Sequence, residues 1–187
     1  MRVTIFCSFR DVGESYTNAA REFAALLAQR GHTLVWGGSN TGTMKVIADA
    51  AQEAGGKIVG ISVEPIKAKA RQNADEMIIA KDWPERRALL LERGDAVCVL
   101  AGGFGTLDEI TEVMEYKKQE LHRKPIVFLN TDGFYDGFKM QLERMEAEGF
   151  LPKKLAEYLF FARTPNEAIS YIEQQSETIV SSQGKRR

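Results

Sequence analysis

The sequence of 187 residues is poor in the residues that build disulfide frameworks and metal sites. It has two cysteines, Cys7 and Cys98, and two histidines, His32 and His122. Both cysteines lie inside apolar runs, which indicates buried, reduced thiols rather than a disulfide. The histidines are far apart in the sequence, and no Cys or His spacing typical of a metal site occurs. We therefore expect a cytoplasmic protein that has no disulfide and binds no metal.

Long apolar runs and an excess of charge of one sign are also absent. No apolar stretch approaches the length of a membrane span, and the apolar run at 3–7 is too short for a signal peptide. Lys and Arg (25) almost balance Asp and Glu (26), for a net charge of −1. This balance gives no basic field, so we expect neither nucleic acid nor a membrane as a partner.

What the sequence does contain is an alternation of β-type and helical patterns. Short, mostly apolar runs predict strands at 3–8, 33–36, 57–62, 76–80, 96–100 and 125–129. Amphipathic stretches predict helices at 15–30, 43–54, 85–93, 106–120, 135–148 and 165–175. Strands that are apolar on both faces are typical of a parallel sheet covered by helices.

This order predicts a single α/β domain over 1–178, a Rossmann-like doubly wound parallel sheet flanked by helices on both faces. Residues 179–187 are predicted to form a polar, flexible C-terminal tail. The longest irregular segment, 63–75, is either a lid over a site or a long connection.

Two glycine-rich turns follow predicted strands and directly precede helices. Residues 37–43 read Gly-Gly-Ser-Asn-Thr-Gly-Thr, and residues 101–106 read Ala-Gly-Gly-Phe-Gly-Thr. Glycine lets backbone N–H groups approach a phosphate at a helix N-terminus, and ligands bind at the carboxyl ends of such strands. One such turn alone is usually a tight connection, but two on one sheet edge indicate a phosphate site. Neither matches a P-loop or dinucleotide fingerprint, which disfavours ATP hydrolysis and hydride transfer.

Charged residues near these turns allow two interpretations each. Thr106 and Glu109 fit a capping box, in which Glu109 reaches back to the start of its own helix. In the alternative, Glu109 lies beside the sugar of a bound nucleotide. Arg86 and Arg87 open another predicted helix, and adjacent arginines usually form a solvated face. Cations at a helix start oppose the helix dipole, however, which indicates an anionic partner.

The segment 101–109 resembles the P-G-G-x-G-T-x-x-E signature of the Lonely Guy (LOG) family. Glu85-Arg86-Arg87 is similar to the E-R-K segment of that family, and 37–44 is similar to its G-G-G-x-x-G-L-M loop. Other parts of the chain also fit the LOG pattern: Cys7-Ser8, Lys124-Pro125-Ile126-Val127, Asn130 and Gly133-Phe134-Tyr135-Asp136. The chain departs from the family pattern at Ser39, Thr43, Lys45, Trp83, Pro84, Arg87 and Ala101.

The resemblance implies a hydrolase that cleaves the N-glycosidic bond of a cytokinin nucleoside 5′-monophosphate, or of AMP, to free base and ribose 5-phosphate. Glu109 and Arg86 are the implied catalytic residues, since a carboxylate beside the ribose stabilises an oxocarbenium-like transition state. The implied phosphate and substrate contacts are Ser8, Gly38, Gly42, Arg87, Gly102, Gly103, Gly105 and Thr106. Trp83 lies in the segment near the base pocket, where a Trp alters which base fits.

The family also implies a homodimer with sites near the subunit interface, and no metal or organic cofactor. Lysine decarboxylation, an older description of such proteins, needs pyridoxal phosphate on a Schiff-base lysine, and the sequence shows no such site. The alternative function is a non-catalytic carrier or sensor of a nucleotide or phosphorylated cofactor on the same fold. The presence of both Glu109 and Arg86 favours the enzyme, because a protein that only binds its ligand has no need of that pair.

Overall fold

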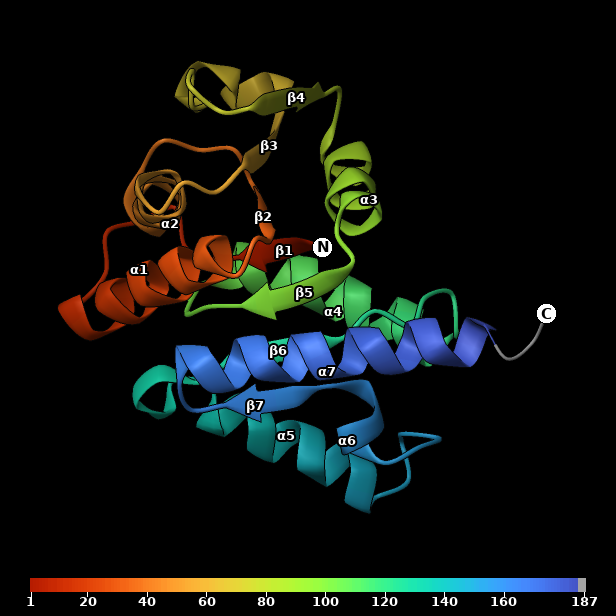
Figure 1. Cartoon of the computed structure of the whole chain (residues 1–187). Coiled ribbons are helices and arrows are strands. Elements are labelled where there is room, and N and C mark those ends of the chain that lie inside the picture. The colour runs from red at the N-terminus through yellow and green to blue at the C-terminus, as the bar shows by residue number, and fades with distance from the viewer. Residues whose placement is uncertain (185–187) are drawn as a thin grey trace.

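Within residues 1–184, which this computed structural model describes, seven strands form one parallel sheet (Figure 1). The strands are β1 (Arg2–Phe6), β2 (Thr33–Trp36), β3 (Ile58–Val63), β4 (Glu76–Ala80), β5 (Ala96–Val99), β6 (Ile126–Leu129) and β7 (Phe160–Ala162). Their order is β4-β3-β2-β1-β5-β6-β7, and each neighbouring pair is parallel. The predicted fold class is confirmed. Chain order reverses between β1 and β5, so ligands are expected at the carboxyl ends of these two strands.

Helices cover both faces of this sheet. One face packs against α1 (Glu14–Gln29), α2 (Gly42–Glu53) and α7 (Pro165–Gly184). The other packs against α3 (Trp83–Arg93), α4 (Phe104–Lys118), α5 (Asp136–Ala147) and the short α6 (Leu155–Tyr158). Two 3₁₀ helices, η1 (Glu64–Lys69) and η2 (Thr131–Gly133), lie in the connections after β3 and β6. No helix among residues 1–184 is long and apolar enough to cross a membrane.

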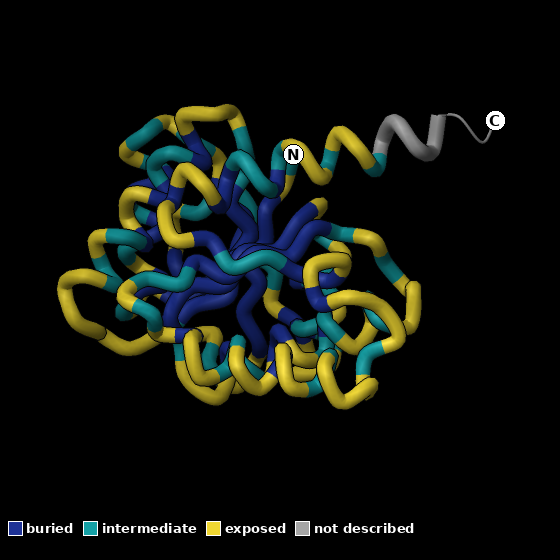
Figure 2. Tube along the Cα trace, turned by 90° about the horizontal axis from the view of Figure 1, so that it is seen from below, coloured by how far each residue is buried: buried dark blue, intermediate teal, exposed yellow. Residues whose placement is uncertain are grey.

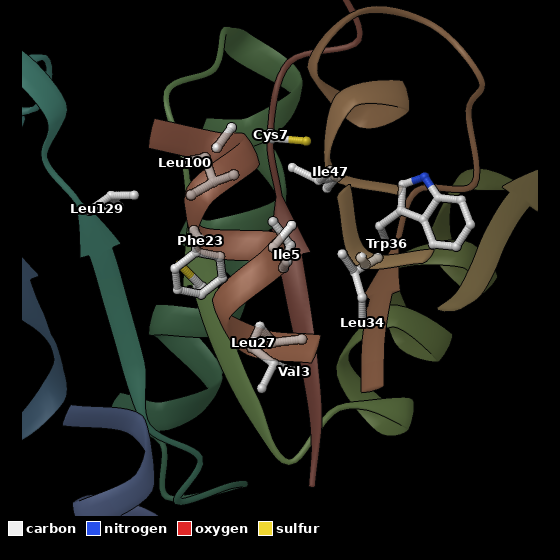
Figure 3. Packing of buried hydrophobic residues seen from close by; sticks show 14 of the residues in the cluster. Val3, Ile5, Cys7, Phe23, Leu27, Leu34, Trp36, Ile47, Leu100 and Leu129 are labelled. Carbon is white, nitrogen blue, oxygen red and sulfur yellow. The ribbon is translucent and has the colours of Figure 1, made fainter. Parts of the chain in front are cut away.

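The core consists of two apolar layers, one on each face of the strands. Val3 and Ile5 of β1 pack with Phe23 and Leu27 of α1, as Figure 3 shows. The tube in Figure 2 shows the strands as the buried centre, with exposed turns around them. Inward-facing Thr4 is the polar exception on β1, and its hydroxyl donates to the Leu90 carbonyl at 2.7 Å. Cys7 and Cys98 are buried and free, as predicted.

The structure adds elements that periodicity did not predict. β7 has three residues and α6 has four, which is too short for a repeating apolar pattern to show. Helix α7 continues past its predicted end at Gln175 to Gly184, into the segment predicted as a tail. Residues 185–187 of that segment lie outside the described residues.

For the segment 63–75, the sequence allowed either a lid over a site or a long connection. In the structure this segment is hydrogen-bonded to the glycine-rich turn after β2. Asn40 N–H donates to the Lys69 carbonyl at 2.9 Å, and Arg71 N–H donates to the Gly38 carbonyl at 2.9 Å. The Arg71 side chain is buried and bonds Asn40 and Gln52 as well. These hydrogen bonds favour a fixed connection over a movable lid.

Candidate functional site

The start of α4 presents unused hydrogen-bond donors at the carboxyl edge of the sheet. Gly103 occupies the N-cap position, and no side chain caps the helix. The N–H groups of Phe104, Gly105 and Thr106 have no acceptor among the described residues, since the first helical bond runs from Leu107 to Gly103. Gly103 and Gly105 face open space. Three unpaired donors and the positive end of the helix dipole together form a site suited to an anion.

Gly102 is required by the packing beneath these donors. A Cβ at this position would overlap the Thr106 hydroxyl, and Thr106 is itself buried. The close approach of backbone to side chain lets the turn from β5 into α4 remain short. We call the backbone of Gly102 to Thr106 the phosphate cradle.

The capping-box interpretation of Thr106 and Glu109 is wrong for this structure. Helix α4 begins at Phe104, so Thr106 lies in its first turn and not at its N-cap. Glu109 therefore lies in the second turn, where it cannot reach the orphan N–H groups. Its carboxylate Oε1 instead accepts a hydrogen bond from Arg86 Nη1 at 2.6 Å.

Arg86 and Glu109 form a buried ion pair between α3 and α4. Their side chains are 6% and 10% exposed. Arg86 also donates from Nε to the Ile61 carbonyl at 2.9 Å and from Nη2 to the Gly37 carbonyl at 3.4 Å. The solvated-face interpretation is therefore wrong for Arg86, whose guanidinium is held by three elements. A buried charge pair held this firmly is costly to desolvate, which makes the pair a functional candidate.

Local sequence explains how Arg86 comes to this position. The Asp82 carboxylate caps α3 by accepting the Glu85 N–H at 2.9 Å, and Pro84 lies in the first turn. Both features fix the start of α3, so Arg86 lies one turn into the helix, facing the sheet. Arg87 points elsewhere: it pairs with Glu112 at 3.0 Å and with Asp108 at 3.2 Å on the surface of α4.

Burial raises the pKa of Glu109 above its ordinary value, and the Arg86 guanidinium acts in the opposite direction. The Cys7 thiol lies within electrostatic reach of both charges. Its pKa is raised mainly by burial and then by the Glu109 charge. Cys7 is thus a buried, un-ionised thiol rather than a nucleophile.

The turn after β2 differs from the turn after β5. Thr43 N–H donates to the Arg10 carbonyl at 3.3 Å, and Met44 N–H donates to the Ser8 carbonyl at 3.2 Å. Gly42 has φ +54°, and a Cβ there would overlap the Phe9 carbonyl. The loop after β1 therefore occupies the start of α2.

Ser8 and Gly38, two other predicted phosphate contacts, also have partners within the protein. The Ser8 hydroxyl accepts the Arg10 N–H at 2.9 Å. Gly38 has φ +73°, and a Cβ there would lie 3.2 Å from the Ile61 nitrogen. These contacts explain both residues without a ligand, and their roles in substrate binding stay predictions.

Trp83 lies beside the ion pair at the first residue of α3. Its ring is 5.8 Å from the Arg86 guanidinium carbon, and the residue is 46% exposed. One face of the ring is thus near Arg86 while part of the side chain is open to solvent. Among the described residues, no three His, Cys, Asp or Glu side chains are grouped as a metal site would need.

Comparison with known proteins matches residues 44–172 to a family described as "Possible lysine decarboxylase". The cytokinin riboside 5′-monophosphate phosphoribohydrolase of Mycobacterium tuberculosis is 32% identical over 169 residues, which cover 89% of this chain and 90% of that protein. A protein of the same description from Arabidopsis thaliana is 33% identical over 88% of this chain and 73% of its own length. The chain belongs to the LOG family.

Solved structures share the LOG-type fold. The Moco carrier protein of Chlamydomonas reinhardtii superposes with a TM-score of 0.74 at 21% identity, over 95% of this chain and 98% of its own. The molybdenum cofactor binding protein of Rippkaea orientalis has a TM-score of 0.73 at 20% identity, over 92% and 95%. At these identities the likeness concerns the fold alone.

Sequence reasoning assigned no role to one residue that contacts the segment leading into the cradle. The Tyr135 hydroxyl donates to the Leu100 carbonyl at 2.7 Å, from the start of α5. The signal was present, since Tyr135 lies in the stretch 133–136 that fits the LOG pattern, but contact between β5 and the segment after β6 is a tertiary property.

Proposed function

We propose that this LOG-family protein is a nucleoside 5′-monophosphate phosphoribohydrolase. The observation that carries the proposal is the distance along α4 between the cradle and the ion pair. Thr106 and Glu109 are three residues apart on one helix, a rise of about 4.5 Å. A ligand phosphate on the free N–H groups would therefore bring an attached ribose to the Glu109 carboxylate.

The proposed reaction adds water across the C1′–N bond. That bond breaks with its electron pair passing to the base, while the ribose develops positive charge at C1′ and O4′. The Glu109 carboxylate stabilises this charge and orients the water that attacks C1′. The water loses one proton, and the departing base nitrogen gains one, so free base and ribose 5-phosphate form. Arg86 favours the ionised form of Glu109 against its burial.

Binding energy from the phosphate, which does not react, positions the sugar at the carboxylate. This assigns the backbone N–H groups of Phe104, Gly105 and Thr106 to phosphate binding. Cytokinin-type monophosphates and AMP are the proposed substrates. The half-exposed Trp83 ring next to Arg86 supports a role in contacting the base.

We place the protein in the cytoplasm, and we propose a homodimer with its sites near the interface. Exposed aromatic side chains on α3 and α4 support the dimer: Trp83, Phe104 (94% exposed) and Tyr116. Light scattering tests this, with a Tyr116→Glu variant expected to shift the population toward monomer. A monomeric wild-type protein at micromolar concentration would refute it.

The activity is tested with purified protein and AMP, CMP, GMP or isopentenyladenosine 5′-monophosphate, each beside its nucleoside. Chromatography of the free bases shows cleavage. We expect base release from at least one monophosphate and from no nucleoside. Nucleotide binding by calorimetry without any base release would instead support a carrier or sensor on this fold.

A further inference from the structure

Tyr135 is fixed in place by its own turn before it contacts any other element. Asn130 Oδ1 accepts the Tyr135 N–H at 2.7 Å, and Asn130 Nδ2 donates to Asp136 Oδ1 at 2.7 Å. Gly133 has φ +70°, and a Cβ there would lie 2.6 Å from the Asp136 carboxylate. The turn between β6 and α5 is thus held by side chains on both sides of Tyr135.

The ring of Tyr135 is packed as firmly as its backbone. The residue is 2% exposed, and its ring lies edge-on to Phe128 of β6 at 5.0 Å and to Phe134 at 4.9 Å. In this packing the hydroxyl points toward the end of β5, at the Leu100 carbonyl. A phenylalanine at this position would keep the ring contacts and lose only the hydroxyl.

The hydroxyl contacts the segment that leads into the cradle. It donates to the Leu100 carbonyl at 2.7 Å. Within residues 1–184 the Leu100 carbonyl has no other hydrogen-bond donor, and Leu100 is buried. Because a buried carbonyl needs a partner, loss of the hydroxyl would displace this backbone or leave it unpaired.

A displacement here would reach the donors directly. Gly102 contacts Thr106 so closely that it has no room for a Cβ, and Gly103 is the N-cap of α4. Gly103 lies three residues after Leu100 and is the first exposed residue of the cradle. The orientation of the free N–H groups therefore depends on where the segment 100–102 is held.

We propose that Tyr135 is a positioning residue that holds the cradle in its phosphate-binding geometry. It does not touch the substrate and acts through the backbone carbonyl of Leu100, two residues before the cradle begins at Gly102. This inference rests on the proposed phosphate site but not on the proposed hydrolysis. It assigns a function to the Asn130–Asp136 turn, which otherwise lies outside the site.

The test is Tyr135→Phe against Tyr158→Phe, with calorimetry of inorganic phosphate and ribose 5-phosphate. Tyr158 is a matched control because it is buried in the same apolar layer and its hydroxyl has no partner among the described residues. We expect Tyr135→Phe to weaken binding of both ligands about tenfold. Tyr158→Phe should change it less than twofold.

A second readout separates positioning from general loosening of the fold. Under Tyr135→Phe, the KM for the cleaved monophosphate should rise with the Kd of ribose 5-phosphate, while kcat changes less than KM. Equal weakening by both variants, or unchanged binding in Tyr135→Phe, would overturn the inference. So would a wild-type protein that binds neither ligand. Phosphate binding without base release would contradict the proposed hydrolysis but not the role of Tyr135. The binding affinities of the two variants would then test that role.

Discussion

The two glycine-rich turns have similar sequences but opposite hydrogen-bonding states. After β2, the N–H groups of Thr43 and Met44 donate to carbonyls of the loop after β1. After β5, the N–H groups of Phe104, Gly105 and Thr106 have no acceptor among the described residues. The first turn joins two parts of the protein, and the second is left for a ligand. A glycine-rich turn before a helix thus supplies the geometry of an anion site, while its neighbours decide whether the site is free.

The largest expected effect comes from removing the charge of Glu109, which lies one helical turn beyond the glycine-rich turn after β5. Glu109→Gln keeps the shape of the side chain and removes its charge, so kcat/KM should fall on the order of a thousandfold. Glu115→Gln, on the exposed side of the same helix, is the control and should retain full activity. Base-release kinetics measure both. A Glu109→Gln enzyme within tenfold of wild type would remove Glu109 from the mechanism.

The pH dependence of activity tests the state of the same carboxylate. Burial raises the pKa of Glu109 above its ordinary value of 4.5, so as pH falls the activity that needs the ionised form should be lost with a midpoint above pH 4.5. Below that midpoint kcat/KM should drop about tenfold per pH unit. Folding raises this pKa, so the contribution of Glu109 to stability falls as pH rises through the same window. The unfolding free energy of the wild type minus that of Glu109→Gln, from urea unfolding, should therefore fall with rising pH while activity rises, and a difference that rises with pH would contradict the assignment.

Gly102→Ala tests the glycine-rich turn after β5, the open turn, whose N–H groups are free. The new Cβ would overlap the Thr106 hydroxyl, which must move and take the cradle with it. We expect kcat/KM for the monophosphate to fall on the order of a hundredfold, because small displacements of binding groups have effects of that size. Titration with ribose 5-phosphate should show a matching loss of affinity. Unchanged affinity would mean that the phosphate binds elsewhere.

Gly42→Ala makes the corresponding change in the turn after β2, the closed turn, whose N–H groups already have acceptors. It should give a different result. The alanine would need φ near +54° and would overlap the Phe9 carbonyl. Strain of this kind costs about 1–3 kcal/mol of unfolding free energy. Thermal unfolding should show the loss, while the folded enzyme keeps its preference for monophosphate over nucleoside. A selective loss of phosphate affinity would show that both turns bind the ligand.

The smallest effect is expected for Gly105→Ala. A Cβ at Gly105 meets no atom within 4 Å, so the fold accepts it. Alanine favours the helix by up to about 1 kcal/mol, yet its methyl enters the space in front of the free N–H groups. We expect unchanged or higher stability together with a KM raised about tenfold or less. Calorimetry and thermal unfolding on one sample compare the two, and a lower KM would contradict the open-turn geometry.

Six of the seven strands could be predicted because each is a short apolar run between breakers, and burial on both faces leaves that pattern in the chain. β7 could not, because Phe160–Ala162 is strand-like only next to β6. For Glu109, local pattern favoured a capping box, since a Thr three residues before a Glu satisfies that rule wherever the helix begins. The structure starts α4 at Phe104, and this shift of two residues turns a cap into an ion-pair partner.

The sequence by itself determined the class of fold, the two glycine-rich turns and the charged residues near them. These follow from periodicity and spacing, which are local properties of the chain. Only the tertiary structure decided that Arg86 meets Glu109, that the loop after β1 closes the start of α2, and that the Tyr135 hydroxyl bonds the Leu100 carbonyl. Each of these contacts joins segments that the sheet brings together. Their physical cause is the pairing of buried polar groups, which depends on neighbours in space rather than in sequence.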